Sequence, residues 1–254
     1  MKLDVLAIGT HPDDVELACG GTVALLAAQG KQVGILHLTR GERGTRGTVA
    51  EREVEAEKAA AALGAVEMAF LDCGDGAFRR GEAEEDALIE VLRSWRPEIV
   101  LGPTPSDRHP DHGRAHQLVA DVAFYAGLAR RGSGTPHRPA AVFSYMQHDP
   151  FDPAFIVDVS SVWDKKMAAL AAYDSQLYGG DSKRGDSDRT DSDRTDSKRS
   201  EPMTKVSSPE YWLAVEGRAR HFGQMINASL GEPFWSRLPL AVRDVTELAP
   251  GGLR

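Results

Sequence analysis

Residues 3–14 of the chain read LDVLAIGTHPDD. The first seven are almost continuously apolar, which is typical of a strand buried on both faces of a parallel sheet. Polar residues follow at once, and a helical pattern then covers residues 13–29 and stops at Gly30. This order predicts a buried strand whose carboxyl end carries a histidine and two aspartates.

The same alternation of apolar strands and helices continues along the chain. We expect further strands at residues 32–39, 66–71, 98–102, 141–146 and 155–159, and further helices at residues 48–63, 82–95, 110–131, 161–176 and 209–230. This order predicts an α/β fold, a Rossmann-like three-layer sandwich with a mostly parallel sheet between helices. In such sheets, ligands bind at the carboxyl ends of the strands.

Composition limits the class of protein. The 254 residues include 38 acidic and 30 basic side chains, a formal net charge of −8. An acidic chain does not favour nucleic-acid binding, which needs a clustered basic surface, and no apolar run is long enough to span a bilayer. The two distant cysteines and the absence of a signal-peptide pattern predict a cytoplasmic protein. We expect one domain over residues 1–254.

One segment departs from this pattern. Residues 179–200 contain no apolar side chain and hold a tandem DSDRT repeat at residues 186–195. Such a segment cannot bury enough surface to offset the entropy lost on ordering. We therefore expect a disordered charged loop at about residues 179–205; a lid or a partner-binding tail is the functional alternative.

Two similar motifs carry the chemistry. His-Pro-Asp-Asp at residues 11–14 follows the first expected strand, and His-Pro-Asp-His at residues 109–112 follows the strand at residues 98–102. Because both motifs lie at strand carboxyl ends, a parallel sheet can bring them together. Pro12 suits the first turn of a helix, and a helix that begins there lets His11 and Asp14 converge.

His11, Asp14 and His112 form a three-ligand zinc set with an open fourth position, the pattern of a catalytic site. Either motif alone has a structural alternative, since Asp13 and Asp14 also favour a helix N-terminus. His116, one turn after His112, is either a fourth ligand or, as we expect, a residue outside the ligand set.

The remaining polar residues of the motifs fit catalytic roles. Asp13 can act as general base on a water that the metal activates. Asp111 can hydrogen-bond a histidine and fix its tautomer. His109 can stay off the metal and, as a cation, stabilise an oxyanion. The chain carries neither a dinucleotide fingerprint, nor a P-loop, nor a nucleophile elbow.

These motifs, with Glu16, Gly20 and Gly21, resemble the LmbE-like, or PIG-L, zinc-dependent N-deacetylases. The resemblance runs from about residue 3 to about residue 234, apart from the DSDRT loop. Residues 40–47, Arg52 and the Asp107-Arg108 pair resemble the bacillithiol-pathway branch, which removes acetyl from N-acetylglucosaminyl malate. The resemblance thus implies a deacetylase with this substrate.

The resemblance also implies a role for each matching residue. By position, the metal ligands are His11, Asp14 and His112, and the general base is Asp13. His109 is the charge-stabilising histidine, and Asp111 is its orienting carboxylate. Tyr211 is a late tyrosine that reaches the oxyanion, and the substrate-binding residues are Arg52 and Arg108. The implied cofactor is Zn²⁺, replaceable by Fe²⁺, Co²⁺ or Mn²⁺. The implied assembly is a closed homo-oligomer, up to a hexamer.

Some of these residues have structural alternatives. Arg52 lies in a run of Glu and Ala, where a solvated ion pair is the default, and Tyr211 beside Trp212 also fits helix packing. Other functions stay open: the same deacetylation on a mycothiol precursor, a chitooligosaccharide or an antibiotic intermediate, or a metal-binding protein without turnover. A nucleotide-binding regulator would rest on the α/β pattern alone.

Overall fold

The computed structural model describes residues 2–177 and 202–244. One sheet contains the strands β1 (Val5–Gly9), β2 (Val33–His37), β3 (Glu67–Phe70), β4 (Ile99–Gly102), β5 (Ala141–Tyr145), β6 (Phe155–Asp158) and β7 (Gly231–Ser236). The helices are α1 (Asp14–Ala28), α2 (Val49–Leu63), α3 (Glu82–Trp95), α4 (Pro110–Tyr125), α5 (Trp163–Ala171) and α7 (Pro209–Met225), with a short 3₁₀ turn at Ser160–Val162.

The sheet is mostly parallel, as the sequence predicts. Its strand order is β3-β2-β1-β4-β5-β7-β6, and the first five strands of that order run parallel. Strand β7 pairs antiparallel with both β5 and β6. The chain leaves β1 toward β2 on one side and later returns through β4 on the other, so the strand order reverses between β1 and β4. Crevices at such reversal points are where α/β sheets bind ligands.

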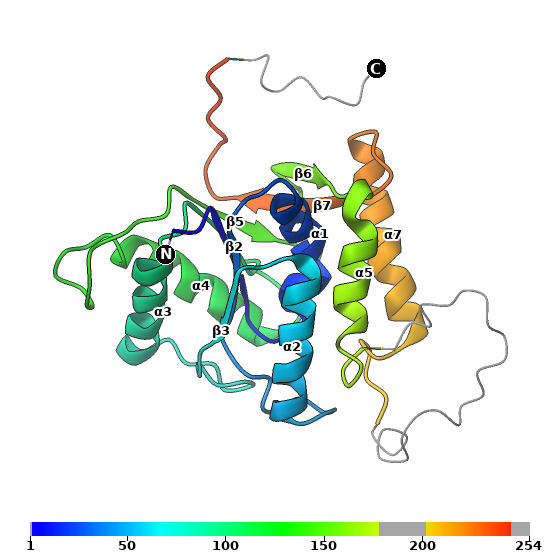
Figure 1. Ribbon diagram of the computed structural model, residues 1–254, viewed down its shortest axis with the longest axis horizontal. Coiled ribbons are helices and arrows are strands. Elements are labelled where there is room, and N and C mark those ends of the chain that lie inside the picture. The colour runs from blue at the N-terminus through cyan, green and yellow to red at the C-terminus, as the bar shows by residue number, and fades with distance from the viewer. Residues whose placement is uncertain (1, 178–201, 245–254) are drawn as a thin grey trace.

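The layers follow from which faces of the elements are apolar. Helices α1, α2, α5 and α7 cover one face of the sheet, and α3 and α4 cover the other (Figure 1). Each face has its own apolar cluster: Leu63 and Phe234 belong to the first, and Leu88 and Val119 belong to the second. The expected three-layer α/β sandwich is therefore confirmed.

Local signals explain several helix ends. Thr48 and Glu51 form a capping box at the start of α2, and Gly64 ends that helix in the left-handed region at φ 79°. Three helices end earlier than the sequence predicts, because α4 ends at Tyr125, α5 at Ala171 and α7 at Met225. Strand β7 has no counterpart among the expected strands.

The expected charged loop at about residues 179–205 falls mostly outside the described residues. Both cysteines, Cys19 and Cys73, are free and buried. Among the helices of residues 2–177 and 202–244, we find none with the length and apolar character needed to cross a bilayer.

Candidate active site

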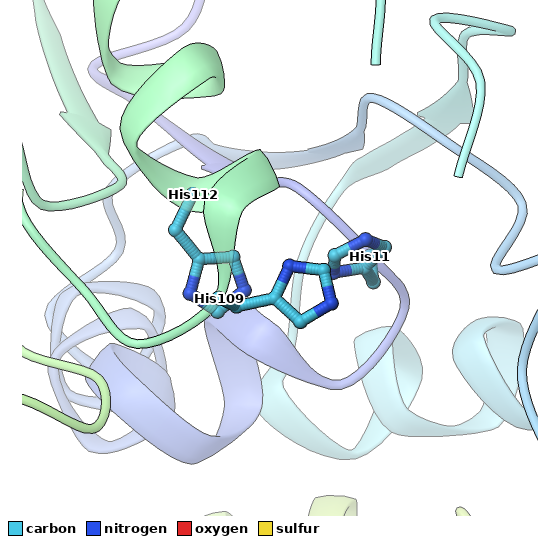
Figure 2. A group of neighbouring side chains, drawn as sticks. All are labelled: His11, His109 and His112. Atoms are coloured by element: carbon cyan, nitrogen blue, oxygen red, sulfur yellow. The ribbon is translucent and has the colours of Figure 1, made fainter. Parts of the chain in front are cut away.

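The two motifs meet at the carboxyl ends of β1 and β4, the neighbouring strands at the centre of the sheet. The first motif forms the turn between β1 and α1, and the second begins α4. Three imidazoles gather there, those of His11, His109 and His112 (Figure 2). Their ring centroids lie 4.8 to 5.5 Å apart, and one nitrogen of each lies within 4.8 Å of the others.

The carboxylate of Asp14 lies between two of these rings. Its Oδ2 is 3.5 Å from Nδ1 of His11, and its Oδ1 is 3.5 Å from Nε2 of His112. Oδ2 also accepts a hydrogen bond from the backbone N–H of His11 at 2.8 Å. Burial opposes ionisation, but His112 and His11 hold the pKa of Asp14 well below its usual range. The aspartate is therefore a buried anion beside two imidazoles.

The outer nitrogens of these rings face other carboxylates. Nε2 of His11 lies 3.2 Å from Oδ1 of Asp75 and 3.6 Å from Oδ2 of Asp111. Nδ1 of His112 lies 3.4 Å from Oδ1 of Asp107. Carboxylates in these positions favour a proton on the outer nitrogen, which leaves the nitrogen beside Asp14 free to bind a metal.

The donor set therefore fits a zinc ion. Two groups of donors lie close enough together to share a metal ion: His11, His109 and His112, and His11, Asp75 and Asp111. Asp14, the third ligand that the sequence predicts, lies 3.5 Å from a nitrogen of both His11 and His112 and is the alternative to His109. Nδ1 of His109 is already engaged, since it accepts the backbone N–H of Asp111 at 3.3 Å as the N-cap of α4. Two imidazoles and one carboxylate leave an open position on a tetrahedral zinc.

Asp13 occupies the most unusual backbone position of the site. It is the N-cap of α1 with φ 97°, in the left-handed region that non-glycine residues rarely adopt. Burial raises its pKa to about 7, although the nearby Arg52 acts in the opposite direction. A carboxyl group that titrates near neutral pH suits a general base.

The start of α1 differs from the sequence prediction. The helix begins at Asp14, so Pro12 precedes it and does not form its first turn. The left-handed Asp13 reverses the chain instead, and the turn brings the Asp14 carboxylate back to the backbone N–H of His11. His11 and Asp14 still converge, but through this turn and not through helical spacing.

The Asp111 carboxylate faces His11 and not His109. Its Oδ2 accepts the backbone N–H of Gly76 at 2.7 Å, and its Oδ1 pairs with Arg114 at 3.0 Å. Only its backbone N–H contacts His109. Burial, followed by the charges of His11 and His112, lowers the pKa of His109, which favours the neutral ring at pH 7.

Arg52 lies beneath the site. It is 5% exposed, and its two Nη atoms donate to the backbone carbonyls of Gly41 at 2.9 Å and Pro12 at 3.0 Å. Its buried Nε has no hydrogen-bond partner among the described residues. A Cβ at Gly41 would overlap the guanidinium, so this close contact requires glycine there. The default of a solvated ion pair does not apply to Arg52.

The other two expected residues lie at the edge of the site. Arg108 is exposed, in the loop between β4 and α4. The Tyr211 ring is 6.0 Å from that of His148, which is itself 6.0 Å from that of His112. Burial raises the pKa of Tyr211 to about 12, so the phenol keeps its proton at neutral pH. The structure thus brings α7 to the site.

Several site residues escaped the sequence analysis. Gln147 donates through Nε2 to Oδ1 of Asp14 at 2.5 Å, and His148 follows it. Both come directly after β5, so the strand-end rule that found the two motifs could have found them. Asp75, which follows β3, obeys the same rule. Asp107 was noted in the sequence, but only for its likeness to a branch of the family.

Two further histidines, His37 and His116, lie outside the proposed ligand set. His37 is fully buried in β2 and stacks on Phe70 at 5.1 Å. Nδ1 of His116 lies 3.0 Å from the Pro103 carbonyl and 3.3 Å from the Ser144 hydroxyl. His116 belongs to neither candidate ligand group within the described part of the chain.

Comparison with known proteins places this geometry in a family. The model of GlcNAc-PI de-N-acetylase, or PIG-L, matches residues 6–123, which include both motifs. The diacetylchitobiose deacetylase of Thermococcus kodakarensis is 34% identical over 188 residues, 68% of this chain and 69% of that protein. The 4-oxalmesaconate hydratase of Pseudomonas putida is 31% identical over 189 residues, 67% of this chain and 73% of that protein.

A solved structure shares nearly the whole fold. The crystal structure of the conserved protein TT1542 from Thermus thermophilus superimposes with a TM-score of 0.81 at 35% identity, covering 94% of this chain and 97% of that one. The chain belongs to the PIG-L/LmbE-like family of metal-dependent N-deacetylases. It is by class a hydrolase, a metal-dependent N-deacetylase.

Proposed function

We propose that this protein deacetylates N-acetylglucosaminyl malate at a zinc ion held by His11, Asp14 and His112. The observation that carries the proposal is the Asp14 carboxylate 3.5 Å from a nitrogen of each histidine, next to Asp13 with its pKa raised to about 7. Zinc, when bound, supplies a Lewis acid for the acetamide carbonyl and lowers the pKa of water. Fe²⁺, Co²⁺ or Mn²⁺ could replace it.

The protein's own residues move the protons. The Asp13 carboxylate accepts a proton from the attacking water as the C–O bond forms. Nδ1 of His109 is an acceptor, so its proton is on Nε2, from which it can donate to the developing oxyanion. Asp13 then delivers the proton that it took from the water to the amine as the C–N bond breaks, which releases acetate and the free aminosugar. The neutral His109 keeps its Nε2 proton and serves as a hydrogen-bond donor, not as the cation that the sequence predicts. The Tyr211 hydroxyl is a second donor to the oxyanion.

Asp111 supports this chemistry as an orienting carboxylate. It lies 1% exposed beside Nε2 of His11, together with Asp75. A histidine fixed in this way presents Nδ1 to the metal, and such contacts raise ligand basicity.

Malate is the most specific part of the proposal, and it rests mainly on Arg108. A malate aglycone carries carboxylates, which arginine binds through paired hydrogen bonds. Arg108 is exposed and makes no hydrogen bond or ion pair with any residue in 2–177 or 202–244, so its guanidinium is available. Arg52, the other substrate contact that the sequence predicts, is less well placed for malate, because its Nη atoms donate to the carbonyls of Gly41 and Pro12 and its Nε is buried. A mycothiol precursor, a chitooligosaccharide or an antibiotic intermediate is the alternative substrate.

We also propose a closed homo-oligomer, up to a hexamer, working in the cytoplasm. The two free, buried cysteines agree with a reducing compartment. Light scattering of the purified protein tests the assembly, and a monomer at micromolar concentration would contradict it.

The test of function is acetate release from N-acetylglucosaminyl malate. Zinc-loaded protein should turn over, and both the Asp13→Ala variant and the metal-stripped protein should not. Replacing Arg108 with Gln should raise KM for the malate conjugate and leave a neutral aglycone unaffected. Zinc binding without turnover would refute malate and direct the search to diacetylchitobiose and related aminosugars, whereas turnover by Asp13→Ala equal to wild type would refute the base.

A further inference from the structure

Helix α1 is broken near its middle. Cys19 has non-helical angles, φ −135° and ψ 19°. In a continuous helix the N–H groups of Gly21 and Thr22 would donate to the carbonyls of Leu17 and Ala18. Here both N–H groups donate to the Glu232 side chain, at 2.9 and 2.6 Å. The break therefore separates the turn that carries Asp13 and Asp14 from the rest of the helix.

Glu232 comes from β7, more than 200 residues further along the chain, and caps the second half of α1. Its carboxylate also accepts the Thr22 hydroxyl at 2.7 Å and pairs with Lys166 of α5 at 2.5 Å. Each charged side chain is 2% exposed. A carboxylate at a helix N-terminus satisfies free N–H groups and suits the helix dipole. A Cβ at Gly21 would lie 2.8 Å from Val159, so this close approach needs glycine.

The carbonyl on the other side of the break is also satisfied by side chains. Leu17 O accepts Nζ of Lys166 at 3.1 Å and Nη2 of Arg218 at 2.9 Å. Arg218 belongs to α7. Its Nη1 donates to the backbone carbonyl of Gln147. The same Gln147 donates through its side chain to the Asp14 carboxylate.

Arg218 therefore contacts both supports of Asp14, the first turn of α1 through Leu17 and the segment after β5 through Gln147. We infer that Arg218 is a positioning residue that sets the Asp14 carboxylate against the two imidazoles, with Lys166 and Glu232 anchoring the other side of the break. This inference rests on the proposed metal site, because its consequence is the geometry of one ligand. Arg218 itself touches neither Asp14 nor a histidine in the described contacts.

The same helix offers a matched control. Arg220 lies two residues further along α7, is exposed and pairs with Glu216 of its own helix. Arg218→Gln removes the charged donor at the break, and Arg220→Gln removes the same charge from the surface. Arg218→Lys keeps the charge but can reach only one of the two carbonyls with comparable geometry.

The first measurement is zinc affinity by competition with a chelator, on protein prepared metal-free. We expect binding at least tenfold weaker in Arg218→Gln, an intermediate loss in Arg218→Lys, and wild-type affinity in Arg220→Gln. Far-UV circular dichroism should be unchanged in all three. Affinity in Arg218→Gln within twofold of the wild type would overturn the inference, as would an equal loss in Arg220→Gln.

The second measurement needs no metal. Amide hydrogen exchange of residues 14–22 in the metal-free protein should be at least tenfold faster in Arg218→Gln than in Arg220→Gln, because the turn loses its anchor. Equal exchange in the two variants would overturn the inference. A wild-type protein that binds no zinc would refute the proposed function, and the exchange comparison would then decide the anchoring role of Arg218 by itself.

Discussion

The turns after β1 and β4 share the sequence His-Pro-Asp but not the backbone. After β4, His109 is an extended N-cap, Pro110 is the first helical residue, and Asp111 lies inside α4. After β1, the same three residue types precede the helix, and Asp13 is a left-handed N-cap. The two motifs are therefore out of step by two residues relative to their helices.

This difference assigns different work to identical residues. The aspartate of the first motif lies in a strained, buried turn with a raised pKa, which suits proton transfer. Burial opposes ionisation of Asp111 in the second motif, yet the nearby His11 and the hydrogen bond from the backbone N–H of Gly76 lower its pKa to about 2, which suits a permanent anion. Residue types alone do not separate a base from an orienting carboxylate; the backbone conformation and the neighbouring charges do.

The largest expected effect separates the two aspartates. Asp13→Gly should lower kcat by about 10²–10⁴-fold, the usual range for loss of a general base. Glycine adopts positive φ freely, whereas alanine does not. The free energy of unfolding of Asp13→Gly should therefore exceed that of Asp13→Ala by about 1 kcal/mol, and its unfolding temperature should be higher. Acetate release and thermal unfolding measure the two. An active Asp13→Gly would end the assignment of the base, and equal stabilities would argue against strain at φ 97°.

Replacing the carboxylates that orient the histidines should have the second-largest effect. Asp75→Asn and Asp107→Asn remove the anions beside the outer nitrogens of His11 and His112. Loss of a carboxylate that orients a metal-binding histidine weakens metal binding by about 10–100-fold. Zinc titration against a chelator checks this, with the exposed Asp164→Asn in α5 as the control. Unchanged affinity in both variants would show that neither carboxylate fixes its histidine.

Glu16, in the first turn of α1, should make the stability of the protein depend on pH. Burial raises its pKa to about 8, and the Tyr173 hydroxyl donates to it at 3.1 Å. Because the pKa of Glu16 is higher in the folded state than in the unfolded state, the protonated carboxyl contributes to the free energy of unfolding. This contribution is complete below the unfolded pKa of about 4.5 and is lost as pH rises through about 8. The metal-free Glu16→Gln variant should therefore lose stability less steeply between about pH 5 and pH 8. Urea unfolding at several pH values measures this. The same pH dependence of the free energy of unfolding in the variant and the wild type would contradict the raised pKa of Glu16.

The smallest effect concerns the prolines. Pro110 occupies the first helical position of α4, where it restricts the unfolded chain, so Pro110→Ala should cost about 0.4–1 kcal/mol. Zinc affinity should not change, because His109 and His112 keep their helical framework. Urea unfolding and zinc titration check the two statements. A large loss of zinc affinity would contradict this prediction, because it would show that Pro110 is needed to hold His109 and His112 in place.

Much of this site could be predicted from strand order. His11, Asp14 and His112 lie together because β1 and β4 are neighbours, and buried apolar strands reveal where their carboxyl ends fall. The backbone of Asp13 could not be predicted, since aspartate rarely adopts positive φ and no neighbour in sequence requires it. The break in α1 could not be predicted either, because the carboxylate that caps it is Glu232, from the far end of the chain.

The identity of the third metal ligand is the most direct test of the proposed site. Zinc affinity should be measured for the wild type, Asp14→Asn and His109→Gln under the same conditions. We predict one zinc per chain in the wild type, loss of tight binding in Asp14→Asn, and near wild-type affinity in His109→Gln. Tight binding by Asp14→Asn together with its loss in His109→Gln would contradict this prediction and assign the site to three histidines.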